Sequence, residues 1–264
     1  MSANMSMNKN TGARADIDAF ADALARARVD GKPLSALSPA LHPATADDAY
    51  AIQYATLERL GVASAGWKIG SKSDDGPIQG APLPSQCVHR GPTTLARNAF
   101  AKPALELEIA FALGRRFEAG SGPYRDEAVF EAIESMCATI EVVASRFAAW
   151  PNVDKLWQLA DLQNHGALIV GESVAYDLNY PFLTPSMRFT LNGKDILGGT
   201  PANTAGDPRR LLPWLVNHCV SRGVAIEAGT VLTCGSYTGM YFPESGGAVL
   251  GEIEGLPPVE LTLA

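Results

Sequence analysis

Residues 105–113 read LELEIAFAL, an apolar run that contains two glutamates, Glu106 and Glu108. In an extended strand, residues i and i+2 point to the same face, so the odd-numbered residues form one apolar face and the two glutamates share the other. Two interpretations fit this pattern. The stretch is either a half-solvated strand with a charged outer face, or a strand that directs a pair of oxygen ligands into a cavity. The segment by itself leaves both open.

A third glutamate, Glu141, occurs in a second predicted strand, ATIEVVASRF, at residues 138–147. This strand is apolar on both faces, so a solvated outer face explains Glu141 less well. An unpaired carboxylate in a core is costly, and a buried Glu therefore neutralises, pairs with a base or binds a cation. If the two strands are neighbours, three carboxylates converge, and such all-oxygen ligation suits Mg²⁺ or Mn²⁺. The alternative is that the three glutamates are salt-bridged or lie on the surface.

Length and composition indicate an ordinary globular protein. The chain has 264 residues, of which 47% are hydrophobic and 19% are charged, and this is enough to bury a large core. The first residues carry no apolar core of a secretory signal, and we expect a flexible tail over residues 1–15. The remainder, residues 16–264, is expected to be a single domain, with a helical part at about 16–64 and a β-rich core at about 65–264.

Several classes of protein are disfavoured. The net charge of −7, without a clustered basic run, argues against a nucleic-acid partner. No apolar run has the length of a membrane span, so no membrane partner is expected. The four cysteines lie far apart without a Cys-x-x-Cys pair, which disfavours structural zinc and favours the reducing cytoplasm as the location.

Periodicity and turn residues predict a chain of short elements. Residues 74–92 are rich in Gly and Pro and are predicted to form a long loop. An Asn192-Gly193 dipeptide predicts a tight hairpin. Helices are predicted at 16–28, 45–61, 126–136 and 207–223, and further strands within 65–73, 165–174, 187–199, 229–236 and 248–263.

Six segments in order resemble the 2-keto-4-pentenoate hydratase family, which includes proteins similar to 4-oxalocrotonate decarboxylase and belongs to the fumarylacetoacetate hydrolase superfamily. They are AYAIQ (49–53), GWKIGSKS (66–73), ELEIAFALG (106–114), IEVVASR (140–146), LADLQNHG (159–166) and GTVLTCGS (229–236). Each segment is weak alone, and their order and spacing make the resemblance specific. It implies an α+β fold, a curled mixed β-roll of the fumarylacetoacetate hydrolase C-terminal type with a helical N-terminal region, and a single catalytic domain.

The resemblance also implies a metal site and a class of substrate. It assigns Glu106, Glu108 and Glu141 as ligands of Mg²⁺ or Mn²⁺, the three residues that the strand pattern had singled out. Family members act on 2-hydroxy-2,4-dienoates or 2-oxo acids, often in the breakdown of aromatic ring-cleavage products. They tend to be homo-oligomers, so we expect a small-molecule substrate and a homo-oligomer.

Further site residues follow from the matching motifs. Lys68 of the Gly-Trp-Lys-Ile-Gly segment is expected to donate a proton or to hold developing negative charge, with a strand-end ion pair as the alternative. Asp161, which the family pattern retains, and His165, a substitution within that pattern, are the other expected catalytic residues. For His165 the alternative is a histidine that satisfies a turn or a backbone carbonyl. Substrate binding is expected from Ser236, Gly235 and Gln79, with a plain turn as the alternative for Ser236.

Other positions depart from the family pattern. Where hydratases carry a Pro-Asp-Phe-Gly-like loop, whose Asp is implicated in the water chemistry, this chain reads LPSQCVH at residues 83–89 and has no Asp. The missing Asp counts against hydration more than against metal-assisted enol–keto chemistry. The family resemblance still makes hydration of a 2-hydroxy-2,4-dienoate the leading hypothesis, with two alternatives at the same site. These are decarboxylation of a 2-oxo-3-enedioate of the 4-oxalocrotonate type and C–C hydrolysis of an acylpyruvate. A catalytically idle protein that binds a metal or a 2-oxo acid is the alternative from another class.

Overall fold

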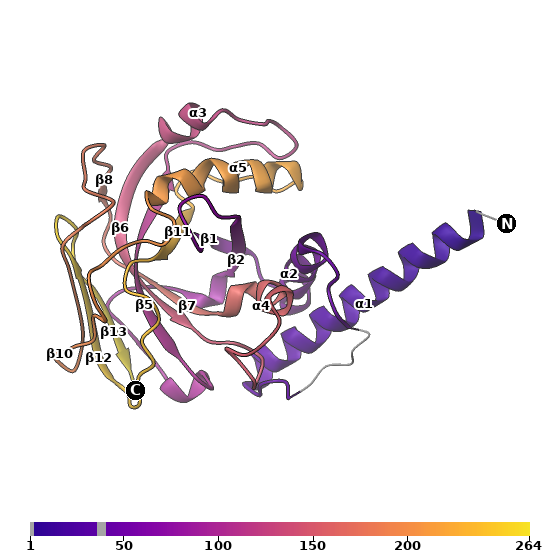
Figure 1. Ribbon diagram of the computed structural model, residues 1–264, viewed down its shortest axis with the longest axis horizontal. Helices are drawn as coiled ribbons and strands as arrows, with labels where there is room; N and C mark the ends of the chain where they lie inside the picture. The colour runs from indigo at the N-terminus through magenta and orange to yellow at the C-terminus, as the bar shows by residue number, and fades with distance from the viewer. Residues whose placement is uncertain (1–2, 36–40) are drawn as a thin grey trace.

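The computed structural model describes the backbone of residues 3–35 and 41–264, and side chains from residue 14 onward (Figure 1). Its centre is an eight-stranded mixed sheet in the order β2-β1-β11-β5-β6-β7-β3, with β8 paired to β6. The β1–β11 and β3–β7 pairs are parallel and the other pairs are antiparallel. The strands are β1 (Ser64–Ser71), β2 (Ile78–Pro84), β3 (Val88–Arg90), β5 (Ala104–Leu113), β6 (Ile133–Val143), β7 (His165–Val170), β8 (Val174–Ala175) and β11 (Val231–Ser236).

A second sheet of five strands packs against β5 and β6, and lies on the left in Figure 1. Its order is β10-β9-β12-β13-β4. The two sheets approach closely at Gly251, where a Cβ atom would lie 2.5 Å from a methyl carbon of Leu107. The strands are β4 (Thr93–Leu95), β9 (Met187–Leu191), β10 (Lys194–Asp195), β12 (Gly247–Ile253) and β13 (Val259–Leu263).

Two N-terminal helices, α1 (Ala3–Asp30) and α2 (Ala46–Leu60), pack on each other and bury Phe20, Leu24 and Ile52. Helix α2 begins at a capping box between Thr45 and Asp48 and ends at Gly61 in the left-handed region. The start of α1 projects away from the body (Figure 1). Residues 3–15 of the expected flexible tail are thus helical, since α1 extends beyond its packed part, and residues 1–2 lie outside the described residues.

Three shorter α-helices occur in the described part of the chain. Helix α5 (Leu211–Ser221) contacts β1 and β2, and a single turn of 3₁₀ helix (Pro208–Arg210) leads into it from Asp207. Helices α3 (Asp126–Phe130) and α4 (Lys155–Ala160) are short. Among the described residues, no helix is both long and apolar enough to cross a membrane.

Two of the predicted elements were wrong. The expected loop at 74–92 contains strand β2, which pairs with β1 over its whole length. Pro82 and Pro84 are compatible with this strand because β2 is at the edge of the sheet, where one side needs no backbone donor. The helix expected at 126–136 ends at Phe130, because pairing with β5 draws the chain into β6 from Ile133.

The predicted hairpin and the predicted fold class are confirmed. Asn192 and Gly193 both have positive φ, 52° and 76°, as a tight hairpin with this dipeptide requires. The α+β class, the curled mixed sheet and the helical N-terminal region are as expected.

The contact at Gly251 gives a test of the sheet packing. We expect Gly251→Ala to destabilise the protein by roughly 1–3 kcal/mol, because the added methyl group meets Leu107 and Val259 in a filled core. Urea unfolding followed by circular dichroism measures the loss as a lower midpoint. Gly198→Ala is the matched control, since nothing lies within 4 Å of its added Cβ atom. Equal midpoints for the two variants would contradict this packing.

Candidate metal centre and adjoining cavity

The antiparallel register of β5 and β6 brings the three glutamates together. Glu106 lies directly opposite Glu141, and Glu108 lies two residues further along β5 on the same face. One oxygen atom from each of the three carboxylates lies within 4.8 Å of the other two. The convergence that the sequence left open is therefore present in the structure.

The carboxylates are withdrawn from solvent. Glu141 is fully buried, Glu108 is 2% exposed and Glu106 is half-buried. This burial favours the interpretation of a strand that directs oxygen ligands inward over that of a charged outer face.

Lys68 of β1 is the cation beside this cluster. Its Nζ lies 2.6 Å from Oε1 of Glu141 and donates a second hydrogen bond, of 3.2 Å, to the carbonyl oxygen of Gln163. The side chain of Lys68 is 13% exposed, so its ammonium is held close to the carboxylates with little water. Within the described residues, three carboxylates thus face one ammonium in this cluster.

The pKa values follow from this imbalance. Burial, together with the negative charge of Glu141, raises the pKa of Glu106 to about 7 and that of Glu108 to about 8. Burial would also raise the pKa of Glu141, but Lys68 and His165 outweigh it and lower that pKa. Burial opposes the charge of Lys68, yet the three glutamates raise the pKa of its ammonium. In the protein without a metal, Glu141 and Lys68 are therefore an ion pair and the other two carboxyls hold protons readily.

Two threonines position Glu108, and the sequence analysis did not find them. Thr233 of β11 donates a hydrogen bond to Glu108, and the hydroxyl groups of Thr233 and Thr139 lie 3.0 Å apart. Both threonines are buried. Their positions in the sequence gave no signal, because β11 was not known to neighbour β5.

A cavity of about 570 Å³ opens beside the carboxylates. Glu106, Glu108 and Lys68 form part of its wall, and Lys72 and Lys155 are two further cations that line it. Other lining residues are Ser71, Trp150, Gln158, Gln163, Asn164 and Met240. A cavity of this size suits a small organic molecule.

Three residues expected to bind substrate also line this cavity: Ser236, Gly235 and Gln79. Gly235 has a φ of 82°, in the left-handed region, and Asn203 fixes the turn by donating hydrogen bonds to the carbonyl oxygens of Cys234 and Gly235. Gln79 lies in β2, so the strand that replaces the expected loop carries it to the cavity.

His165 lies behind Glu141 rather than on the cavity wall. It is fully buried, and its Nδ1 lies 2.9 Å from Oε1 of Glu141. Burial, which outweighs the effect of Glu141, lowers the pKa of His165 to about 4, so the ring is neutral at pH 7. Because an ionised carboxylate can only accept, Nδ1 carries the proton and donates a hydrogen bond to Glu141. The structure therefore places His165 against Glu141 and not on the wall of the cavity, where a general acid or base would meet a substrate.

Asp161 is part of a buried ion pair and is absent from the cavity wall. Its Oδ1 accepts a hydrogen bond of 2.6 Å from Nε of Arg146. Its Oδ2 accepts hydrogen bonds from the Ser145 hydroxyl and from the Arg146 backbone. Both carboxylate oxygens of Asp161 are hydrogen-bonded to Arg146 or Ser145, so the structure does not bring Asp161 to the cavity where its catalytic role was expected.

The donor set fits a hard divalent cation. Oε2 of Glu141 is buried and has no hydrogen-bond partner among the described residues. Such an atom is costly unless it is paired with a donor or with a cation. All the converging donors are carboxylate oxygens, which Mg²⁺ and Mn²⁺ prefer.

The chain is similar in sequence to known proteins over most of its length. A 2-keto-4-pentenoate hydratase of Paraburkholderia xenovorans (strain LB400) is 26% identical over 250 residues, 90% of this chain and 91% of the relative. The 2-keto-4-pentenoate hydratase 2 of Dechloromonas aromatica (strain RCB) is 27% identical over 258 residues, 94% of this chain and 97% of the relative.

A solved structure shares the fold. The 4-oxalocrotonate decarboxylase from Pseudomonas putida G7, in complex with magnesium and adipate, superposes with a TM-score of 0.82 at 21% identity, over 95% of this chain and 98% of that one. The family profile described as fumarylacetoacetate (FAA) hydrolase C-terminal matches residues 74–264, which is most of the chain. The resemblance found from the motifs is thereby confirmed, and the chain belongs to the fumarylacetoacetate hydrolase family.

Proposed function

We propose that this protein is a divalent-metal-dependent lyase that adds water to a 2-hydroxy-2,4-dienoate or 2-oxo-enoate, as 2-keto-4-pentenoate hydratases do. The observation that carries the proposal is the convergence of Glu106, Glu108 and Glu141 beside Lys68 at the wall of one cavity. The named activity of the relatives supports the same reaction class and a role in the catabolism of aromatic compounds.

The three glutamates would hold Mg²⁺ or Mn²⁺. When bound, the cation would act as a Lewis acid that stabilises negative charge developing on a 2-oxo acid. His165 keeps Glu141 oriented by donating a hydrogen bond to it, and Thr233 does the same for Glu108. The magnesium in the Pseudomonas putida decarboxylase supports a hard cation at this site.

Lys68 supplies the proton in this proposal. Its ammonium lies at the junction between the glutamates and the cavity, so it reaches a substrate held there and delivers a proton from Nζ. Ser236 and Gln79 line the same cavity and would hold the polar end of the substrate with their hydroxyl and amide groups. Decarboxylases and hydratases of 2-oxo acids both need such a proton donor.

A second candidate reaction has its own support. Lys72 and Lys155 line the cavity and are exposed, so they offer positive charge away from the glutamates. This charge would favour a substrate with a second carboxylate at its far end, such as a 2-oxo-3-enedioate. Decarboxylation of a 4-oxalocrotonate-type substrate is therefore the alternative, and the adipate in the related decarboxylase, itself a dicarboxylate, supports it.

The proton donor can be tested directly. We expect Lys68→Met to lower kcat for 2-hydroxypenta-2,4-dienoate by roughly 10²–10⁴-fold, the usual contribution of a general acid, while Mn²⁺ still binds. Loss of dienoate absorbance gives the rate, and chromatography identifies the product as a hydroxy-oxo acid. Lys194→Met, an exposed lysine of β10, is the matched control. Unchanged turnover in Lys68→Met, or no turnover of any tested 2-oxo acid by the wild type, would contradict the proposal.

The carboxyl cluster predicts how stability depends on pH. Between pH 6.5 and 8 the folded metal-free protein retains protons on Glu106 and Glu108 that the unfolded chain has lost, since their pKa values are about 7 and 8. Stability must then fall as pH rises through this window. We expect the melting temperature to fall with pH, and Mn²⁺ to restore it more strongly at pH 8 than at pH 6.5.

Two variants sharpen this test. Glu108→Gln removes one of the titrating carboxyls, so the fall in melting temperature between pH 6.5 and 8 should become smaller. Glu134→Gln changes an exposed residue of β6 and should keep the wild-type profile. The assignment fails if all three proteins give the same pH profile.

The two reactions can be separated by the distal lysines. If the dicarboxylate reaction is the natural one, Lys72→Gln with Lys155→Gln should raise KM for a 4-oxalocrotonate-type enedioate about tenfold, because each lost charge weakens a partly exposed ion pair. The KM for the monocarboxylate dienoate should stay unchanged. Steady-state kinetics with carbon dioxide detection measure both. An equal change for the two substrates would remove the dicarboxylate alternative.

A further inference from the structure

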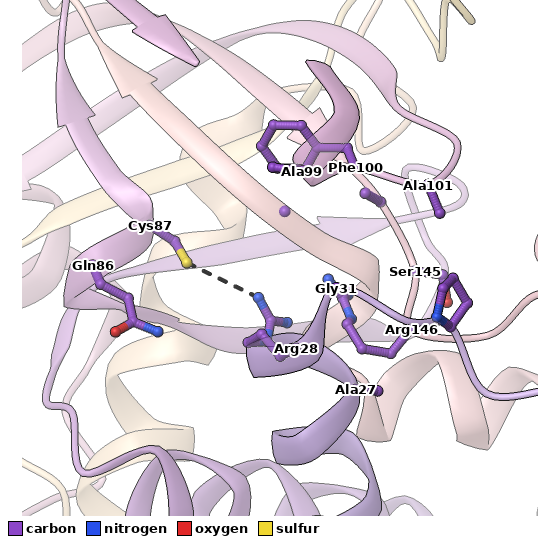
Figure 2. Close-up of a pocket in the computed structure, with 13 residues that line it drawn as sticks. Ala27, Arg28, Gly31, Gln86, Cys87, Ala99, Phe100, Ala101, Ser145 and Arg146 are labelled. Atoms are coloured by element: carbon purple, nitrogen blue, oxygen red, sulfur yellow. Dashed lines mark hydrogen bonds between the residues drawn. The ribbon is translucent and has the colours of Figure 1, made fainter. Parts of the chain in front are cut away.

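A second cavity lies apart from the carboxylates. It has a volume of about 350 Å³ and shares no lining residue with the cavity beside the glutamates. It lies between the end of helix α1 and the segment that follows β6, and Figure 2 shows Arg28 at its wall with the guanidinium directed toward Cys87. Arg146 and Phe100 line it as well.

The charges around this cavity do not balance. The side chains of Arg28 and Arg146 are each only 8% exposed, and one carboxylate, Asp161, lies beside them. Nε of Arg146 lies 2.6 Å from Oδ1 of Asp161, whereas Nη2 of Arg28 lies 3.9 Å from the same oxygen. No acidic side chain is among the residues described as lining the cavity. Among the described residues, these two buried guanidinium groups therefore share one carboxylate, that of Asp161.

The guanidinium of Arg28 also has more N–H donors than it meets acceptors among the described residues. A guanidinium carries five N–H groups. Among the described residues, Arg28 donates one hydrogen bond, of 3.0 Å to the carbonyl oxygen of His165, and makes one longer contact, of 4.0 Å to the sulfur of Cys87. A buried cation with so few partners is costly, and an anion in the adjoining cavity would supply both the charge and the acceptors.

We propose that this cavity binds a small anion that carries a carboxylate or phosphate group, held by Arg28 and Arg146. Planar or tetrahedral oxyanions match the forked donors of two arginines, and the volume admits a molecule of a few carbon atoms. The carbonyl oxygen of His165 accepts hydrogen bonds from both arginines, at 3.0 and 2.8 Å. The anion site thus adjoins the residue that positions Glu141, although it stands independently of the proposed reaction.

Calorimetric titration of the full chain without added metal tests the proposal. Sodium phosphate and sodium succinate are the two probes, used separately in a low-salt buffer, and they distinguish a phosphate from a carboxylate ligand. We expect at least one of them to bind to the wild type and to bind at least tenfold more weakly to Arg28→Gln. Arg26→Gln, an exposed arginine two residues earlier on α1, is the matched control and should bind as the wild type does.

The outcomes decide the proposal in either direction. Equal affinity of Arg28→Gln and the wild type for the probe that binds would overturn it. No binding of either probe up to 10 mM would also overturn it, because about 10 mM is the weakest dissociation constant that such a two-arginine site should give. If Arg28→Gln does not fold, a crystal of the wild type soaked in selenate decides instead. An anomalous peak between Arg28 and Arg146 supports the proposal, and its absence from this cavity refutes it.

Discussion

The arrangement of the whole site follows from one electrostatic constraint, the confinement of three carboxylates with one ammonium in a space that excludes most water. Each added negative charge in such a place raises the cost of the others. The ion pair between Lys68 and Glu141 relieves part of that cost, and the hydrogen bonds to Glu108 and Glu141 relieve a further part. What remains is a cluster of carboxylates whose negative charge a divalent cation would neutralise.

The main sheet makes this confinement possible. Five strands that are adjacent in the sheet, β1, β11, β5, β6 and β7, each contribute to the cluster. In that order they supply Lys68, Thr233, the Glu106–Glu108 pair, Glu141 and His165. Because strands hold their neighbours at a fixed spacing, the side chains keep their relative positions without support from loops. A site on strands is well suited to chemistry that depends on exact placement of charge.

The sequence predicted the part of this site that is local in the chain. The two-residue period of a strand placed Glu106 and Glu108 on one face, and an apolar surrounding marked Glu141 as unusual. The meeting of β5 with β6 is a non-local pairing, so the convergence itself could only be a hypothesis. The helix expected at 126–136 was wrong in its second half for the same reason. That half belongs to β6, because it pairs with the distant strand β5. Thr233 gave no signal because its neighbour on β5 lies 125 positions away.

Burial is the other property that the residues alone did not reveal. His165 and Asp161 are of types that often serve as acids and bases, yet each is held by a buried partner away from the cavity. Arg28 received no assignment from the sequence, and only the packed structure shows how few acceptors it meets among the described residues.

Anomalous diffraction from a crystal soaked in Mn²⁺ tests the account most directly. It predicts one strong manganese peak bounded by the carboxylates of Glu106, Glu108 and Glu141, with Lys68 beside it. A peak at another place, or none while these three side chains keep their positions, would contradict the account.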